Sequence, residues 1–110
     1  MGEAGFVGIL SVDLQLPASM GLKAKRKELR RLKSALAKRF ACSTAEVDHH
    51  DLWQRARLTL AFVGAEAGEA DAQVEAAARW IHADPEFVVL GETRDLIEAA
   101  GEFADTWGSG

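Results

Sequence analysis

The order in which two periodicities follow one another along the chain constrains its fold more than any other feature. Residues 6–16 alternate between apolar and polar side chains, which is the period of a strand with one covered face. Residues 22–40 instead repeat apolar side chains along one helical stripe: Leu22, Leu29, Leu32, Leu36 and Phe40. Strand-like patterns return at 44–52 and 57–63, a helical pattern at 69–83, and a last strand from 87 to about 92.

This order predicts an α+β fold, a ferredoxin-like βαββαβ two-layer sandwich with an antiparallel sheet. The length of 110 residues suits one domain with a single core. We expect the domain to occupy residues 1–95. Residues 96–110 are an acidic C-terminal tail, for which partial helix (around 95–104) and disorder are both open.

Composition and cysteine content favour a cytoplasmic protein. The chain is 48% hydrophobic and 27% charged, which is ordinary for a globular domain. Its one cysteine, Cys42, cannot form a disulfide within the chain, as suits a reducing compartment. No stretch approaches the roughly 20 apolar residues of a membrane span, and the N-terminus lacks the basic start of a secretory signal. We therefore expect no membrane association.

The first helix is strongly basic, although the whole chain carries a net charge of −4. Between Leu22 and Arg39 there are nine lysines and arginines and a single acid, Glu28. At about 100° per residue, Lys23, Lys27, Arg30, Arg31 and Lys38 lie opposite the apolar stripe, with Arg26 and Lys33 at its margin. A phosphate backbone or an acidic protein would relieve the repulsion among these charges. The alternative is a solvated face neutralised by the acidic second half of the chain.

A polar segment, residues 46–51, is the second candidate site. Strand alternation puts Glu46, Asp48 and His50 on one face, joined by Asp13 from the first strand. These side chains could bind a divalent metal. The alternative, which we favour, is a polar network in which Arg55 and Arg57 neutralise the carboxylates across a hairpin. We expect no metal site and no cofactor.

Nothing in the sequence indicates an enzyme. There is no Gly-rich phosphate loop and no nucleophile elbow. The side chains expected on the open sheet face include no aromatic residue, so base stacking on the sheet is not expected. Trp53 and Trp80 are interpreted as packing residues.

Two stretches, residues 22–26 and residues 45–56 with their Asp-His-x-Asp-Leu-Trp-Gln-Arg run, resemble the YlxP-like family of bacterial proteins of unknown function. The resemblance spans residues 6–95 in order and spacing. It implies a ferredoxin-like fold and no established catalytic activity. Members are typically encoded near translation initiation and ribosome-maturation factors, which implies a ribosome-linked or RNA-linked role.

The leading hypothesis is a small non-enzymatic protein that binds rRNA, the ribosome or another anionic partner through its basic helix. The residues expected to contact phosphates are Lys23, Arg26, Lys27, Arg30 and Arg31. One alternative is a protein–protein module or homodimer that covers the open sheet face. The other is a metal-binding protein around the Asp-His strand.

Overall fold

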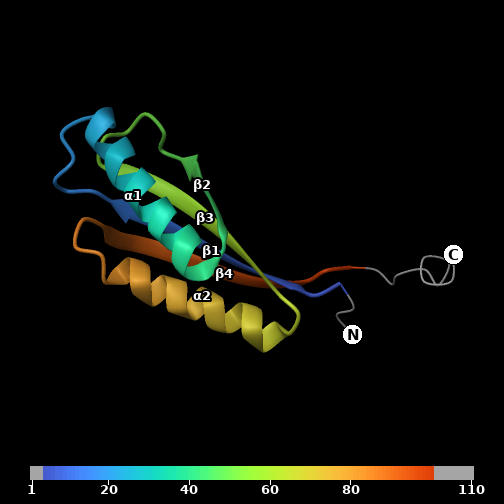
Figure 1. The fold of residues 1–110 in the computed structure, drawn as a ribbon. Helices are drawn as coiled ribbons and strands as arrows, with labels where there is room; N and C mark the ends of the chain where they lie inside the picture. The colour runs from blue at the N-terminus through green and yellow to red at the C-terminus, as the bar shows by residue number, and fades with distance from the viewer. Residues whose placement is uncertain (1–3, 101–110) are drawn as a thin grey trace, which may run out of the picture.

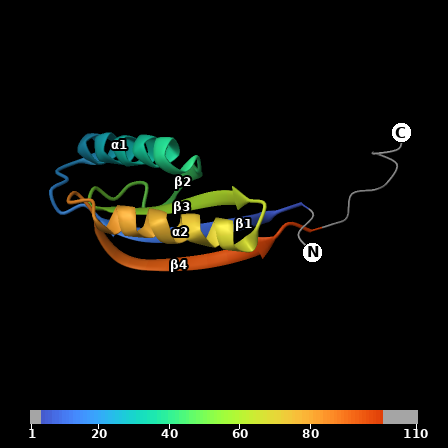
Figure 2. The same ribbon diagram turned by 60° about the horizontal axis from the view of Figure 1, so that its bottom comes forward.

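Six elements follow one another in the expected order in the computed structural model, which describes residues 4–100. They are β1 (Phe6–Gln15), α1 (Leu22–Phe40), β2 (Ser43–Asp48), β3 (Arg55–Gly64), α2 (Ala67–His82) and β4 (Val88–Glu98). The strands form one antiparallel sheet in the order β2-β3-β1-β4, and both helices cover the same face (Figure 1; Figure 2). The ferredoxin-like α+β fold predicted from the sequence is confirmed.

The core lies between the sheet and the two helices. Even-numbered residues of β1 and β3 point toward the helices because side chains alternate along a strand. The buried side chains from these strands are Leu10, Val12, Leu14, Ala56, Leu58, Leu60 and Phe62. They meet the leucines of α1 and the apolar stripe of α2, which is mostly alanine. No helix of residues 4–100 has the length and apolar character needed to cross a membrane.

The opposite face of the sheet is open, and its side chains form rows across β3, β1 and β4. In order, the rows are Val63-Val7-Ile97, Ala61-Ile9-Asp95, Thr59-Ser11-Thr93 and Arg57-Asp13-Gly91. The open face therefore runs from an apolar end, near the chain termini, to a charged end. No aromatic side chain stands in these rows, as expected.

The last strand is longer than predicted. β4 continues to Glu98 and pairs with β1 through Asp95 and Ile97, opposite Ile9 and Val7. The helix considered around residues 95–104 is therefore wrong for residues 95–98, and the strand crosses the expected boundary at residue 95. Pairing prevails because the outer edge of β1 would otherwise leave backbone donors and acceptors without partners. The remainder of the tail, residues 101–110, lies outside the described residues.

The close approach of α2 to β1 at Gly8 gives a stability prediction. A Cβ at Gly8 would lie 2.7 Å from Cγ2 of Val74 and 3.0 Å from the carbonyl oxygen of Ala70. We expect Gly8→Ala to lower the free energy of unfolding by about 1–3 kcal/mol through overpacking, measured by urea denaturation. The control is Gly68→Ala, where a Cβ meets nothing within 4 Å. An unchanged midpoint for Gly8→Ala would contradict this account of the packing.

Candidate functional site

The exposed side of α1 carries six basic side chains that make neither an ion pair nor a ring contact with any described residue, whereas Arg39, also without an ion pair, lies over the rings of Phe40 and Trp80. We call this set the basic face: Lys23, Arg26, Lys27, Arg30, Lys33 and Lys38. All are exposed except Lys33, which is half-buried. Four of the five residues expected to contact phosphates are in this set. The alternative of internal neutralisation would require acids within residues 4–100 to pair with these cations, and they do not.

Arg31, the fifth expected contact residue, has a different role. Its guanidinium donates two hydrogen bonds to Asp84, at 2.9 and 3.1 Å, and a third to Glu28 at 2.9 Å. Hydrogen bonds to Asp84 and Glu28 raise the pKa of Arg31, so its charge is fixed in place. Arg31 therefore ties α1 to the loop before β4, and we remove it from the candidate binding set.

The structure also shows a buried lysine that the sequence analysis did not single out. The side chain of Lys25 is 1% exposed, and its ammonium lies 2.8 Å from Oε2 of Glu46. It also donates to the carbonyl oxygens of His49 at 2.7 Å and Leu52 at 2.9 Å, with His50 O farther away at 3.4 Å. A signal was present: Lys25 fills the gap of seven between Leu22 and Leu29 in the apolar stripe.

A β-bulge explains why Lys25 meets Glu46. In the β2–β3 pair, Glu46 stands opposite Leu58 but Asp48 stands opposite Arg57, so Val47 is the extra residue. Glu46 therefore points to the helix side and Asp48 to the open face. The prediction that Glu46, Asp48 and His50 share one face is wrong, because strict alternation fails at a bulge.

The favoured polar network forms on the open face around Asp13. One carboxylate oxygen of Asp13 accepts from Arg55 at 2.8 Å and from Arg57 at 3.3 Å, and Arg57 also reaches Asp48. Burial raises the pKa of Asp13, but the two arginines outweigh it and the pKa is lowered overall. The cluster is thus internally neutralised, and no group of three or more His, Cys, Asp or Glu in residues 4–100 could hold a metal ion.

His49 joins the two polar systems. Its backbone has φ of 66°, a left-handed conformation in which histidine is among the better-tolerated residues. This bend turns its carbonyl toward Lys25, while Nε2 of its ring lies 3.3 Å from Oδ1 of Asp13. The backbone of this loop is therefore held by Lys25 on the helix side, and the ring of His49 lies beside Asp13 on the open face.

That loop presents large apolar side chains to solvent. Leu52 is 48% exposed and Trp53 is 54% exposed. The interpretation of Trp53 as a packing residue is therefore wrong. Trp80 does pack: its ring meets the ring of Phe40 edge-on, with the ring centroids 6.3 Å apart. The amide of Gln54 donates to the carbonyl oxygens of Pro17 and Ser19, so the loop also abuts the segment leading into α1.

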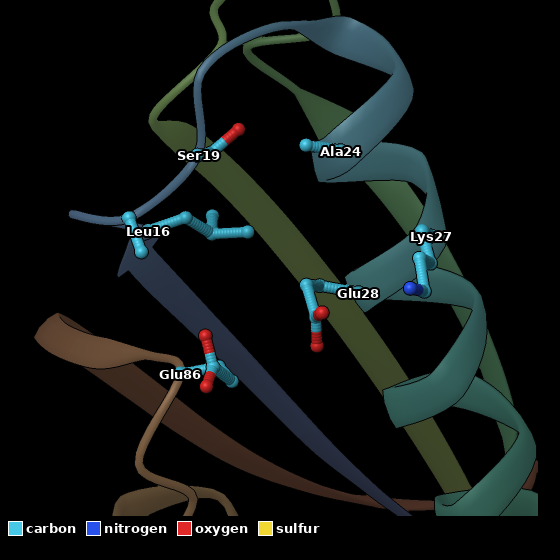
Figure 3. Close-up of a pocket in the computed structure, with 7 residues that line it drawn as sticks. Leu16, Ser19, Ala24, Lys27, Glu28 and Glu86 are labelled. Atoms are coloured by element: carbon cyan, nitrogen blue, oxygen red, sulfur yellow. The ribbon is translucent and has the colours of Figure 1, made fainter.

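A pocket of about 160 Å³ lies beside the basic face, between the start of α1 and the loops before α1 and β4 (Figure 3). Its charged lining residues are Lys27, Glu28 and Glu86. The pocket is smaller than the roughly 300–1,000 Å³ of typical small-molecule sites. Two carboxylates on its walls disfavour an anionic ligand inside it.

A family model described as "Protein of unknown function (DUF503)" matches residues 7–94 of the chain. No curated protein matches the chain. The match confirms the expectation of a family of unknown function, and the narrower YlxP-like assignment stays a prediction. The matched range contains α1, the bulged strand and the loop with Trp53.

The role of Lys25 predicts the effect of its removal. In Lys25→Met the carboxylate of Glu46, which is 18% exposed, loses its cation, and two loop carbonyls lose their closest donor. We expect a loss of about 3 kcal/mol in the free energy of unfolding, as when one partner of a buried pair is removed. Urea denaturation measures this, and hydrogen exchange should show faster opening of residues 49–54.

The matched control is the double substitution Lys25→Met with Glu46→Leu, which removes both charges. It should recover part of the lost stability, because no buried charge is then left without a partner. If the single variant were as stable as the wild type, Lys25 would not hold this loop.

Proposed function

Because the chain belongs to the DUF503 family of proteins of unknown function, we propose its function from its own geometry: it is a small, non-catalytic cytoplasmic protein that binds RNA through the basic face of α1. The observation that carries this proposal is the absence of any acid partner, within residues 4–100, for the six basic side chains of that face. Regularly spaced phosphates supply the complementary charge, and the release of their counterions drives binding. Ribosomal RNA is the abundant cytoplasmic polymer of this kind.

The start of α1 adds to the positive potential. The helix begins after Gly21 with no side-chain cap and no acidic residue in its first turn. The positive end of the helix dipole is therefore not offset locally. Lys23 stands in this first turn, so helix dipole and side-chain charge act at the same place.

The proposal does not include base recognition by the sheet. Asp13 and Asp48 stand on the open face beside the arginines that neutralise them. Their carboxylates would lie close to any phosphate laid across the sheet, and the arginines there already have partners. The helix is therefore the surface that favours a polyanion.

A second candidate function is self-association through the apolar end of the open face. Val63 is 73% exposed and Ile97 is 45% exposed, and they flank Val7 in one row. A second copy stacked on this row would remove three branched apolar side chains from water on each subunit. This surface lies on the face of the sheet opposite α1, so the two functions are compatible.

Removing charge from the basic face tests RNA binding. We expect Lys27→Gln with Arg30→Gln to weaken binding of a single-stranded RNA oligonucleotide. It should also flatten the slope of log affinity against log salt by about 1.4, since each phosphate contact contributes about 0.7. Fluorescence anisotropy across a salt series measures both.

The matched control is Arg79→Gln with Arg94→Gln, which makes the same change in net charge. Both arginines are already paired with Glu75, away from the basic face. This control should keep most of the wild-type affinity. Equal losses in the two double variants would show that only net charge matters and would contradict a site on α1.

Self-association is tested by sedimentation velocity over a concentration series. We expect the wild type to approach twice the monomer mass as concentration rises, and Val63→Asp with Ile97→Asp to stay monomeric, because buried unpaired carboxylates oppose the contact. A wild type that stays monomeric throughout would remove the second candidate.

A further inference from the structure

Three large apolar side chains gather where the β2–β3 loop meets the segment before α1. We call them the apolar tip: Met20, Leu52 and Trp53, which are 79%, 48% and 54% exposed. Met20 follows Ser19 and Trp53 precedes Gln54, and the hydrogen bond between Gln54 and Ser19 joins the two segments at 3.1 Å. Figure 1 shows the β2–β3 loop beside the beginning of α1. The two loops that carry these three side chains are therefore joined directly.

The backbone beneath Trp53 is held in place. Lys25 donates a hydrogen bond to the carbonyl oxygen of Leu52. The carbonyl oxygen of Gln54 accepts a hydrogen bond from the backbone amide of Leu16 at 2.9 Å. These bonds anchor the residues on either side of Trp53. An aromatic ring displayed on an anchored loop loses little conformational entropy when it binds, which is the condition for an efficient contact.

The tip continues into the basic face. A shallow groove of about 530 Å³ runs along the start of α1, and Met20 forms part of its wall. The rest of its lining is Gly21, Lys23, Ala24, Lys27 and Arg30. The groove thus has small apolar residues, three cations and no acid. Its neighbour, the pocket in Figure 3, contains Glu28 and Glu86, so phosphates are favoured on the groove side of Lys27.

We propose that Trp53 is a stacking platform for an unpaired base of single-stranded RNA whose phosphates follow Lys23, Lys27 and Arg30 along this groove. This inference rests on the proposed RNA binding and deepens it by naming the strandedness of the partner. Trp53 lies on a loop that is hydrogen-bonded to the segment leading into this groove, and a cationic groove with an exposed aromatic ring nearby is the combination that binds single strands. A base within a duplex offers no free face to a ring on a loop, whereas an unpaired base does. A protein partner would also cover Met20 and Leu52, but the uniform positive charge of the groove favours phosphates.

The experiment compares Trp53→Ala, Trp53→Phe and wild type on two probes, a single-stranded RNA oligonucleotide and a blunt RNA duplex. Stacking on one base typically changes affinity by between about 5-fold and 140-fold. We therefore expect Trp53→Ala to lose affinity for the single strand within that range and to bind the duplex as wild type does. Trp53→Phe should restore most of the lost affinity, since it keeps an aromatic face. Val63→Ala, which truncates an exposed apolar residue on the open sheet face, is the control. It should change neither the affinity for the single strand nor the affinity for the duplex.

Other outcomes overturn the proposal, and they separate it from RNA binding itself. Wild-type affinity of Trp53→Ala for the single strand, with Lys27→Gln/Arg30→Gln still weakened, would reject stacking and retain the basic face. An equal loss on single strand and duplex would also reject it, as would failure of Trp53→Phe to restore binding. A wild type that binds neither probe at low salt would reject the proposed function as well. Because Trp53 is exposed, all variants should share the wild-type thermal midpoint.

Discussion

The ion pair and hydrogen bonds of the buried Lys25 ammonium hold together α1, β2 and the β2–β3 loop. A buried cation is costly unless it is paired and hydrogen-bonded. Lys25 meets that condition with one carboxylate and two close carbonyl oxygens. Those acceptors come from β2 and from the loop after it, so one side chain of α1 fixes three segments relative to one another. Together with the hydrogen bonds of Gln54, it sets the path of the β2–β3 loop and the position of Trp53 on it.

The bulge at Val47 supplies the acceptor and at the same time separates two polar systems. By adding one residue, it sends Glu46 to the helix side for Lys25 and Asp48 to the open face for Arg57. His49 then spans both sides through its carbonyl and its ring. The dense run of acids and histidines in this segment is thereby explained by structure. Glu46 and Asp48 have partners within the fold, whereas the cations of the basic face do not.

The parts that could be predicted from the sequence are those governed by uninterrupted periodicity. The bounds of α1 and the alternation of β1 follow from spacing alone, and so does the topology. The failures lie where a long-range contact overrides the local pattern. Glu46 changes side because of a bulge, residues 95–98 are extended because β1 needs a partner, and Arg31 is neutralised by Asp84, 53 positions away. The prediction that Trp53 packs is wrong because large aromatic residues are usually buried, whereas this one lies 54% exposed on the β2–β3 loop.

The net charge of −4 does not oppose RNA binding, because the charges are segregated. Exposed acids lie at the start of α2, along α2 and on β4, among them Glu66, Glu69, Asp71 and Asp95, and Asp48 and Asp51 lie at the end of β2 and in the loop after it. The unpaired cations are on α1. At physiological salt the Debye length is about 8 Å, so a phosphate on α1 is affected mainly by the charges of that helix. In the proposed complex, the acids of α2 disfavour a strand that passes over that helix, and the cations of α1 favour a path along α1. The proposed binding of one strand requires Lys23, Lys27 and Trp53 to lie at the same end of the fold, and the hydrogen bonds of Lys25 and Gln54 join the segments that carry them.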